Sequence, residues 1–224
     1  MPSKTVPAAR ERRNRKPADP DGSYHHGDLQ EALIAATEAI LTDEGAEGFT
    51  LREAARRAGV SPAAPSHHFG NAPGLLTEVA IRGYDELGAA LKQAAARKGS
   101  ARQRLQAQGL AYVAFALRYP GRFNMMFSNR RLNAEDERLR KAVKAAHREL
   151  EVMVEDMLGE RGEADPRRAR IVATLAWSTV HGYAKLALEG KFGAVETEAG
   201  RREIMATLRP VLDYLWPAAS DTRR

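Results

Sequence analysis

Apolar residues along this chain recur every three or four positions, which is the spacing of one face of an α-helix. The first stripe consists of Leu29, Ala32, Leu33, Ala36, Ile40 and Leu41. Later stripes predict helices over about 73–96, 135–158, 167–188 and 198–215, and a further helix that carries Leu105, Leu110, Val113 and Leu117 and ends at Tyr119. A short apolar piece lies at 123–127. Runs of β-branched residues with the alternation of a strand are absent. The pattern therefore predicts an all-α protein of about nine helices.

Residues 50–69 have the pattern of two short helices joined by a tight turn. Thr50 and Glu53 are spaced as a capping box, which predicts that a helix begins at Leu51. Gly59 stands where such a helix ends in a left-handed residue, because glycine adopts that conformation without steric cost. The first helix and the turn after it are thus both specified locally.

The second short helix is predicted to begin with Ser61 as its N-cap and Pro62 at its first position, and to end near His68. Pro65 lies four residues after this cap, so it removes a backbone donor to Ser61 and should distort the first turn. Two short helices at this spacing describe a helix-turn-helix, whose second helix reads the DNA major groove. An ordinary helical hairpin in an enzyme core is the alternative.

A supporting helix precedes this motif. Asp28 and Glu31 form a second capping box, and the first apolar stripe continues from there to a stop at Gly45. Phe49 closes the loop that leads to the next helix. We therefore expect a three-helix unit within residues 23–70.

Composition restricts the class of protein further. The chain of 224 residues contains no cysteine, which excludes disulfides and thiolate metal sites. No apolar run is long enough to cross a bilayer, and the N-terminus lacks the hydrophobic core of a signal peptide. We expect a cytoplasmic protein with no metal and no cofactor.

The net charge of +6 is unevenly distributed. Residues 1–20 hold six Lys and Arg against two acids, whereas residues 21–76 hold three arginines against eight acids. Residues 1–22 are predicted to form a disordered basic arm, which lies along DNA or is simply a solvated tail. A short tail is expected at 218–224. Attraction for phosphate must come from this arm, from a local patch or from partly charged histidines.

Residues 24–76, YHHGDLQEALIAATEAILTDEGAEGFTLREAARRAGVSPAAPSHHFGNAPGLL, resemble the DNA-binding region of the tetracycline-repressor (TetR) family of bacterial transcription regulators. The elements that carry the resemblance are Thr50, Ala55, Ala58, Gly59, Val60, Ser61, His68, Phe69, Leu75 and Leu76. A second segment pair, YVAFALRYPGRFNMMF (112–127) and WSTVHGYAKLALEGKF (177–192), resembles the family's regulatory domain in its Trp-His-Gly variant. The resemblance implies a DNA-binding domain at 23–70 and a ligand-binding and dimerisation domain at 71–217.

This chain departs from the family at several positions that usually contact DNA. Many relatives carry a threonine and a tyrosine where this chain has Ala64 and Ser66, and a lysine where it has Ala72. Those contacts cannot be transferred. The remaining candidates offer a polar group or a small apolar surface at the motif. The predicted DNA-binding residues are Thr50, Arg52, Ser61, Ala63, Ala64, Ser66, His67 and His68. Arg56 and Arg57 are as readily explained as a solvated helix face.

The regulatory domain of this family implies a ligand cavity between helices. The candidate lining residues are Phe115, Phe123, Met126, Phe127, His147, Met153, Trp177 and His181, with ordinary core packing as the alternative for each. The family's dimers join through their last two helices as a four-helix bundle. That resemblance places Trp177, Gly182, Leu186, Leu208, Leu212 and Leu215 at or near a homodimer interface.

The implied function is a dimeric repressor that binds a palindromic operator in double-stranded DNA, associates with the bacterial nucleoid in this way, and is released by an apolar small-molecule effector. A ligand-independent or non-specific DNA-binding protein is the alternative, although the acidic balance of residues 21–76 argues against non-specific binding. Catalysis is much less favoured, because no nucleophile, paired-carboxylate, phosphate-loop or metal-ligand pattern stands out. His68 has two readings, a contact to DNA or packing beside Phe69.

Overall fold

The computed structural model describes residues 22–128 and 130–217, with side chains from Asp28 onward. Within these ranges the chain forms α-helices and no strand, which confirms the predicted all-α class. The helices are α1 (Gly22–Asp43), α2 (Leu51–Ala58), α3 (Ala64–Phe69), α4 (Ala72–Ala95), α5 (Ala101–Arg118), α6 (Pro120–Met126), α7 (Glu137–Glu160), α8 (Pro166–Leu188) and α9 (Glu198–Leu215). The proposed basic arm, apart from its last residue, and the tail at 218–224 lie outside the described part.

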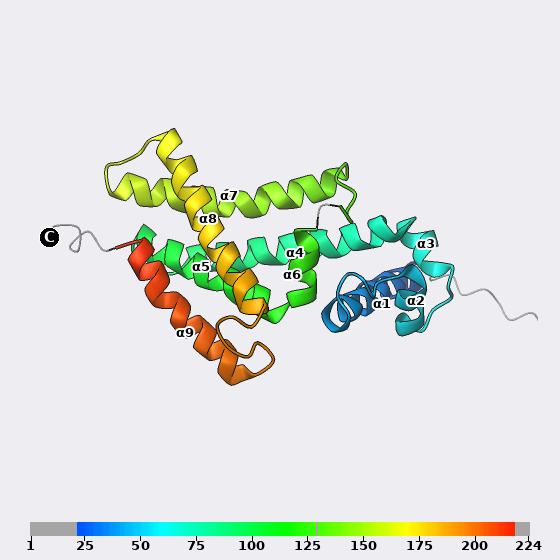
Figure 1. The fold of residues 1–224 in the computed structure, drawn as a ribbon. Coiled ribbons are helices and arrows are strands. Elements are labelled where there is room, and N and C mark those ends of the chain that lie inside the picture. The colour runs from blue at the N-terminus through cyan, green and yellow to red at the C-terminus, as the bar shows by residue number, and fades with distance from the viewer. Residues whose placement is uncertain (1–21, 129, 218–224) are drawn as a thin grey trace, which may run out of the picture.

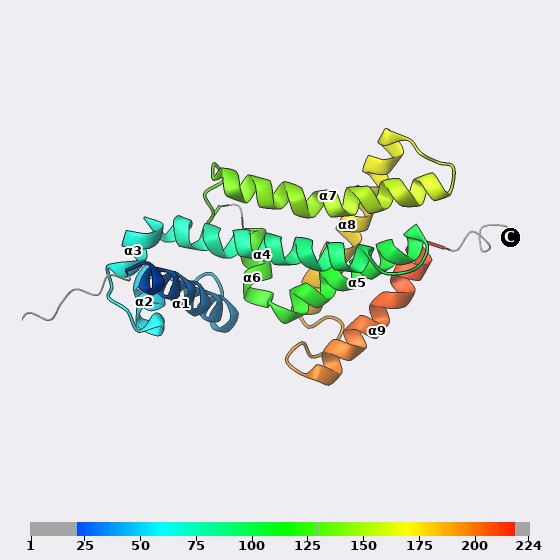
Figure 2. The ribbon, with the colours of Figure 1, turned by 180° about the vertical axis from the view of Figure 1, so that it is seen from behind.

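The helices form an elongated molecule with the helix-turn-helix at one end (Figure 1). The long helix α4 leads from that end into the larger group of helices, where α7 runs beside it and α8 crosses both (Figures 1 and 2). The short helix α6 lies between this group and α1, and α9 lies at the end farthest from α2 and α3. Of the helices that the structure describes, none is long and apolar enough to cross a membrane.

The start and end of α2 follow the local sequence signals. The Thr50 hydroxyl oxygen accepts a hydrogen bond from the Glu53 N–H at 3.1 Å, as an N-cap does. At the other end Gly59 has a φ of 68°, and the N–H of Val60 donates to the Ala55 carbonyl at 3.0 Å. The second half of the predicted capping box is not formed, because the Glu53 carboxylate instead accepts hydrogen bonds from Arg56 and Arg57.

Two predicted helix starts are wrong. Helix α1 begins at Gly22, so Asp28 lies inside it, since no proline in residues 22–28 interrupts the helical backbone. Helix α3 begins at Ala64 rather than Pro62, and the Ala64 N–H donates to the Ser61 carbonyl in a turn at 3.0 Å. Pro65 cannot donate the next helical bond, so the helix starts late enough to place this proline in its first turn, where no donor is needed.

The helix-turn-helix shares its small core with the rest of the chain. Phe49 is buried there with Ile40 of α1 and Ala54 of α2. Leu75 and Val79 of α4 belong to the same cluster, and so does Met125 of α6. This core therefore continues past residue 70 and joins α1 and α2 to α4 and α6.

Candidate DNA-binding face and ligand cavity

The outer face of the helix-turn-helix presents most of the residues that the sequence singles out for DNA contact. Ser61, Ala63, Ser66 and His67 are exposed, as are Thr50 and Arg52 at the start of α2. Ala64 and His68 are half-buried, and the His68 ring lies 6.4 Å from that of Phe69, so His68 also packs against its neighbour. The face is exposed, polar and short, which suits insertion of α3 into a groove.

The three arginines of α2 differ in the ion pairs that they form. Arg57 forms ion pairs with Asp43 at 2.7 Å, with Glu53 at 3.0 Å and with Glu44, and so ties α2 to the end of α1. Arg56 pairs with Glu53 at 2.6 Å. Hydrogen bonds from Arg56 and Arg57 lower the pKa of Glu53 to about 2. Their positive charge is therefore largely balanced by neighbouring acids.

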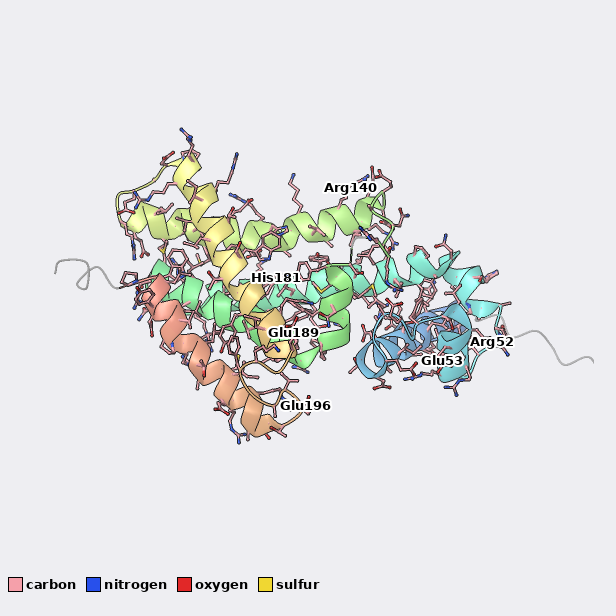
Figure 3. All side chains as sticks on the ribbon, in the orientation of Figure 1. Arg52, Glu53, Arg140, His181, Glu189 and Glu196 are labelled. Atoms are coloured by element: carbon pink, nitrogen blue, oxygen red, sulfur yellow. The ribbon has the colours of Figure 1, made fainter. Side chains whose placement is uncertain are left out.

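Arg52 is the exception on this helix. It is exposed and forms no ion pair with any described residue, and Figure 3 places it at the outer end of the molecule. An unpaired guanidinium at the edge of a recognition surface is suited to a DNA phosphate. Of the residues named from the sequence, Arg52 is thus the best candidate for a positively charged contact with a DNA phosphate.

Helix α6 connects this end of the molecule to the regulatory helices. A Cβ on Gly121 would lie 2.6 Å from the Leu41 carbonyl carbon and the Thr42 nitrogen, so only glycine permits this contact with α1. The adjacent Arg122 pairs with Glu38 of α1 at 2.6 Å and with Glu86 of α4. Burial would lower the pKa of Arg122, but its two acidic partners raise it above its usual value. Arg122 therefore stays charged and connects α6 to α1 and α4 through ion pairs.

A cavity of about 50 Å³ lies between the regulatory helices. Helices α4, α5, α7, α8 and α9 all contribute to its wall, and Phe127 closes it beside α6. The lining residues are mostly apolar or aromatic: Tyr84, Leu87, Leu91, Leu105, Gln108, Gly109, Tyr112, Phe127, Ala146, His147, Leu150, Ala176, Trp177, Val180, Leu212 and Trp216. None of these residues is a lysine, arginine, aspartate or glutamate.

Most polar groups in this wall are paired within the protein. The Tyr84 hydroxyl donates to the Met126 carbonyl at 3.0 Å. The Tyr112 hydroxyl lies 2.9 Å from Nδ1 of His181 and accepts from the Trp177 indole N–H at 3.4 Å. Burial raises the pKa of Tyr84 to about 12 and raises that of Tyr112 further, and it lowers the pKa of His181. At neutral pH these three groups therefore remain uncharged.

Some of the predicted ligand-binding residues line the cavity, and others do not. Phe127, His147 and Trp177 line the cavity. His181 of α8 (Figure 3) does not line it, but its ring centre lies 4.5 Å from that of Phe127. The other four are packed in the core and do not line it: Phe115, Phe123, Met126 and Met153. Sequence reasoning missed Tyr84, Gln108, Tyr112 and Trp216, because helical periodicity identifies a buried face without showing where packing leaves space.

The predicted interface residues are also divided. Leu186 is exposed and Gly182 and Leu215 are half-buried, whereas Trp177 lines the cavity. The side chains of Leu208 and Leu212 are buried in the protomer's own core, so they are not on the exposed surface of α9, and their place near an interface stays a prediction. The large apolar side chains left exposed on these two helices are Ile171, Leu175, Leu186, Val211 and Tyr214.

A helix-turn-helix mounted on a larger helical domain with an internal cavity defines a class of DNA-binding transcription regulators. Comparison with known families gives the particular group. Residues 33–79 match the family described as bacterial regulatory proteins of the tetR family, and residues 105–217 match the tetracyclin repressor-like C-terminal domain. The chain belongs to the TetR family of transcriptional regulators. The finer resemblance to the Trp-His-Gly variant stays a prediction.

Solved structures agree with this assignment. A protein of unknown function from Rhodococcus sp. RHA1 is 32% identical, with a TM-score of 0.70 over 88% of this chain and 97% of that one. PfmR of Thermus thermophilus, a TetR-family transcriptional regulator, shares the fold at 16% identity, with a TM-score of 0.64 over 84% of this chain and 98% of its own. FadR of Bacillus subtilis, solved with stearoyl-CoA, shares it at 14% identity, with a TM-score of 0.66 over 84% and 97%. No curated protein matches the chain.

Proposed function

We propose that this protein is a homodimeric repressor that binds a palindromic operator through α3 and is released when a small molecule occupies the cavity. The observation that carries the proposal is the exposed face of α3 and α2, with Ser66, His67 and Arg52 directed away from the core. In a dimer, two such faces would meet successive major grooves roughly 34–36 Å apart.

The exposed apolar face of α8 and α9 supports dimerisation. Ile171 and Tyr214 are 68% and 91% exposed, and Leu175 and Leu186 lie on the same side of α8 as Ile171, at helical spacing. A Cβ on Gly182, within this face, would meet nothing within 4 Å, so a partner helix can approach closely there. Apolar side chains gathered in this way are typical of a surface that another chain covers.

The contact between α6 and α1 supports release by a ligand. Phe127 lines the cavity immediately after α6, while Gly121 and Arg122 at the other end of α6 contact α1. A ligand that pushes Phe127 outward would shift α6 and, with it, the position of α1 and α3. Such a ligand would favour a spacing of the two recognition helices that does not fit the operator.

Selection of bound sequences from a random DNA pool tests the proposed function. A palindromic motif with two half-sites about one helical turn apart is the expected result. Recovery of unrelated sequences, with an affinity that depends on salt alone, would instead establish the alternative of a non-specific DNA-binding protein. Repeating the selection with candidate effectors would separate a ligand-released repressor from a ligand-independent one.

Replacing Arg52 with alanine is expected to weaken binding to all DNA sequences to a similar degree, because a phosphate contact carries no sequence information. The slope of log affinity against log salt concentration should decrease in magnitude by about 1. Arg56→Ala is the matched control on the same helix, since Arg56 is already paired with Glu53. Equal slopes for the wild type and Arg52→Ala would contradict the assignment.

Replacing His67 with alanine tests the central contact of α3. His67 is exposed near the middle of this short helix, so we expect its loss to weaken operator binding by about 1 kcal/mol or more and to relax the preference at one base pair. A gel-shift titration with the selected operator and with single-base variants measures both effects. Unchanged affinity together with unchanged preference would remove His67 from the interface.

A further inference from the structure

An open groove of about 620 Å³ lies between α4, α5 and α9. Helix α4 packs against α5 and α5 against α9, and the groove uses the half of α4 that lies farther from α3 (Figure 2). Its floor consists of Leu110, Phe115 and Met205 together with the short side chains of several alanines. Leu110 and Met205 are half-buried, so the floor presents apolar surface to solvent.

Three exposed arginines border this floor: Arg97 just after α4, Arg118 at the end of α5 and Arg209 on α9. None of the three forms an ion pair with a residue that the structure describes. On the same helix as Arg118, by contrast, Arg102 lies 3.6 Å from the carboxylate of Asp213. The three positive charges at the groove are therefore not balanced within the described protomer.

The acidic side chain in the groove does not change this balance. Glu86 is the one acid among the described residues that line the groove, and its carboxylate is paired with Arg122 of α6. A smaller hollow adjoins the groove at Arg118 and adds Arg201 of α9. The Arg201 guanidinium donates to the Val195 carbonyl at 2.7 Å and pairs with no described carboxylate. The whole surface thus attracts anions.

The residue types in the groove are those of a protein interface. Arginine, tyrosine, phenylalanine and methionine are enriched at such interfaces and lysine is depleted. The groove contains all four of the first types, and no lysine is among the described residues that line it. A small amphipathic anion fits less well, because small-molecule sites bury most of the ligand and this groove is open.

The shape of the groove favours a helix as the bound element. Helices form its walls, and the described chain has no strand whose edge could pair with an extended peptide. Along α4 the wall extends from Glu86 to Arg97, which at the rise of an α-helix is about 16 Å, or about three turns of a docked helix.

The groove also stays open in the proposed dimer. Met205 and Arg209 lie on the opposite side of α9 from Val211 and Tyr214, which belong to the exposed apolar face. The DNA-binding face is at the other end of the molecule (Figure 1). A partner in the groove, a second protomer and DNA therefore have separate surfaces.

We propose that this groove binds an acidic amphipathic helix of another protein. The apolar face of that helix packs on Leu110, Phe115 and Met205, and its carboxylates pair with the three unpaired arginines, which suit bidentate bonds to carboxylates. The apolar contacts supply affinity, and the charges select an acidic partner over a neutral or basic one. The inference goes beyond the proposed function and does not rest on it, because it involves neither DNA nor the cavity.

Designed peptides test the proposal on the full-length protein without DNA. The probe is a fluorescein-labelled helical peptide in which leucine and alanine form one face and glutamate flanks it. A second peptide carries lysine at each glutamate position, and a third has the composition of the first in an order that forms no apolar face. Fluorescence anisotropy measures the affinities. We expect the acidic amphipathic peptide to bind at least about tenfold more tightly than either control, and more weakly as salt increases.

Charge reversal locates the bound peptide. Arg118→Glu and Arg209→Glu, made separately, should each weaken binding of the acidic peptide by about fivefold or more and should strengthen binding of the lysine peptide. Arg52→Glu is the matched control, because it makes the same reversal at an exposed, unpaired arginine outside the groove. Its affinity for the acidic peptide should stay within about twofold of the wild type. Gain of the lysine peptide also shows that a reversed variant is folded.

Several results would overturn the proposal. Equal binding of the acidic amphipathic peptide and its reordered version would show only a general attraction for anions. Absence of binding, or a preference for the lysine peptide, would remove the partner altogether. Loss of binding in Arg52→Glu but in neither groove variant would place the peptide on the DNA-binding face. Displacement of the peptide by an equal concentration of dodecanoate would assign the groove to a small anionic amphiphile.

Discussion

Replacing Leu175 with glutamate is expected to give a monomer that no longer binds its operator. Leu175 lies on the exposed apolar face of α8, between Ile171 and Gly182. In a two-fold symmetric dimer the substitution occurs twice, so two carboxylates would be buried against apolar surface. We expect the dimer dissociation constant to rise by on the order of 100-fold or more, which corresponds to about 3 kcal/mol.

Operator affinity should fall when the dimer dissociates, because a monomer contacts only one half-site with one recognition helix and therefore binds more weakly. Analytical ultracentrifugation measures the first effect, and a gel shift measures the second. Val152→Glu is the matched control, since Val152 is also an exposed apolar side chain but lies on α7. A Leu175→Glu protein that remains dimeric at micromolar concentration would place the interface elsewhere.

A substantial loss of stability is expected for Gly121→Val. A Cβ at this position would lie 2.6 Å from backbone atoms of Leu41 and Thr42, and backbone cannot move aside as the end of a side chain can. Overpacking of this kind costs about 2–3 kcal/mol, which lowers the melting temperature of a protein of this size by roughly 4–12 °C. Thermal unfolding followed by circular dichroism measures the change.

Gly88→Ala is the control for the glycine substitution. Gly88 lies within α4, and a Cβ there would be 3.7 Å from the Ala146 Cα, an ordinary contact. We expect this variant to be as stable as the wild type or up to about 1 kcal/mol more stable, because alanine favours a helix. If Gly121→Val unfolds at the temperature of the wild type, α6 does not rest on α1 as closely as described.

The Gly121 contact also bears on regulation. Arg122 beside it is paired with Glu38 of α1 and Glu86 of α4, so α6 is fixed to both helices at one end while Phe127 borders the cavity at the other. A variant that loosens this contact and still folds should bind effector and operator with weaker mutual influence. Under the proposed function, this short segment would carry the coupling between the two sites.

How far the sequence predicts the candidate site depends on the residue. The position of the recognition surface was predictable, since Thr50 and Gly59 fix the ends of α2 through contacts with their own neighbours. The pairing of Arg57 with Asp43 was not, because those residues meet only after α1 and α2 pack. Arg52 stands out as a candidate for DNA contact only once its neighbours Arg56 and Arg57 are seen to be paired.

The sequence by itself determined the all-α class, the helix-turn-helix and most helix boundaries, because caps, glycines and prolines act over a few residues. The start of α3 was predicted wrongly at Pro62, although the local effect of Pro65 explains why the helix begins at Ala64. Only the tertiary structure decided that Leu208 and Leu212 face inward, that Leu175 and Tyr214 face outward, and that Gln108 borders a cavity. An apolar stripe shows that a helix face must be covered, but the rotation of that helix against its neighbours depends on residues far away in the chain.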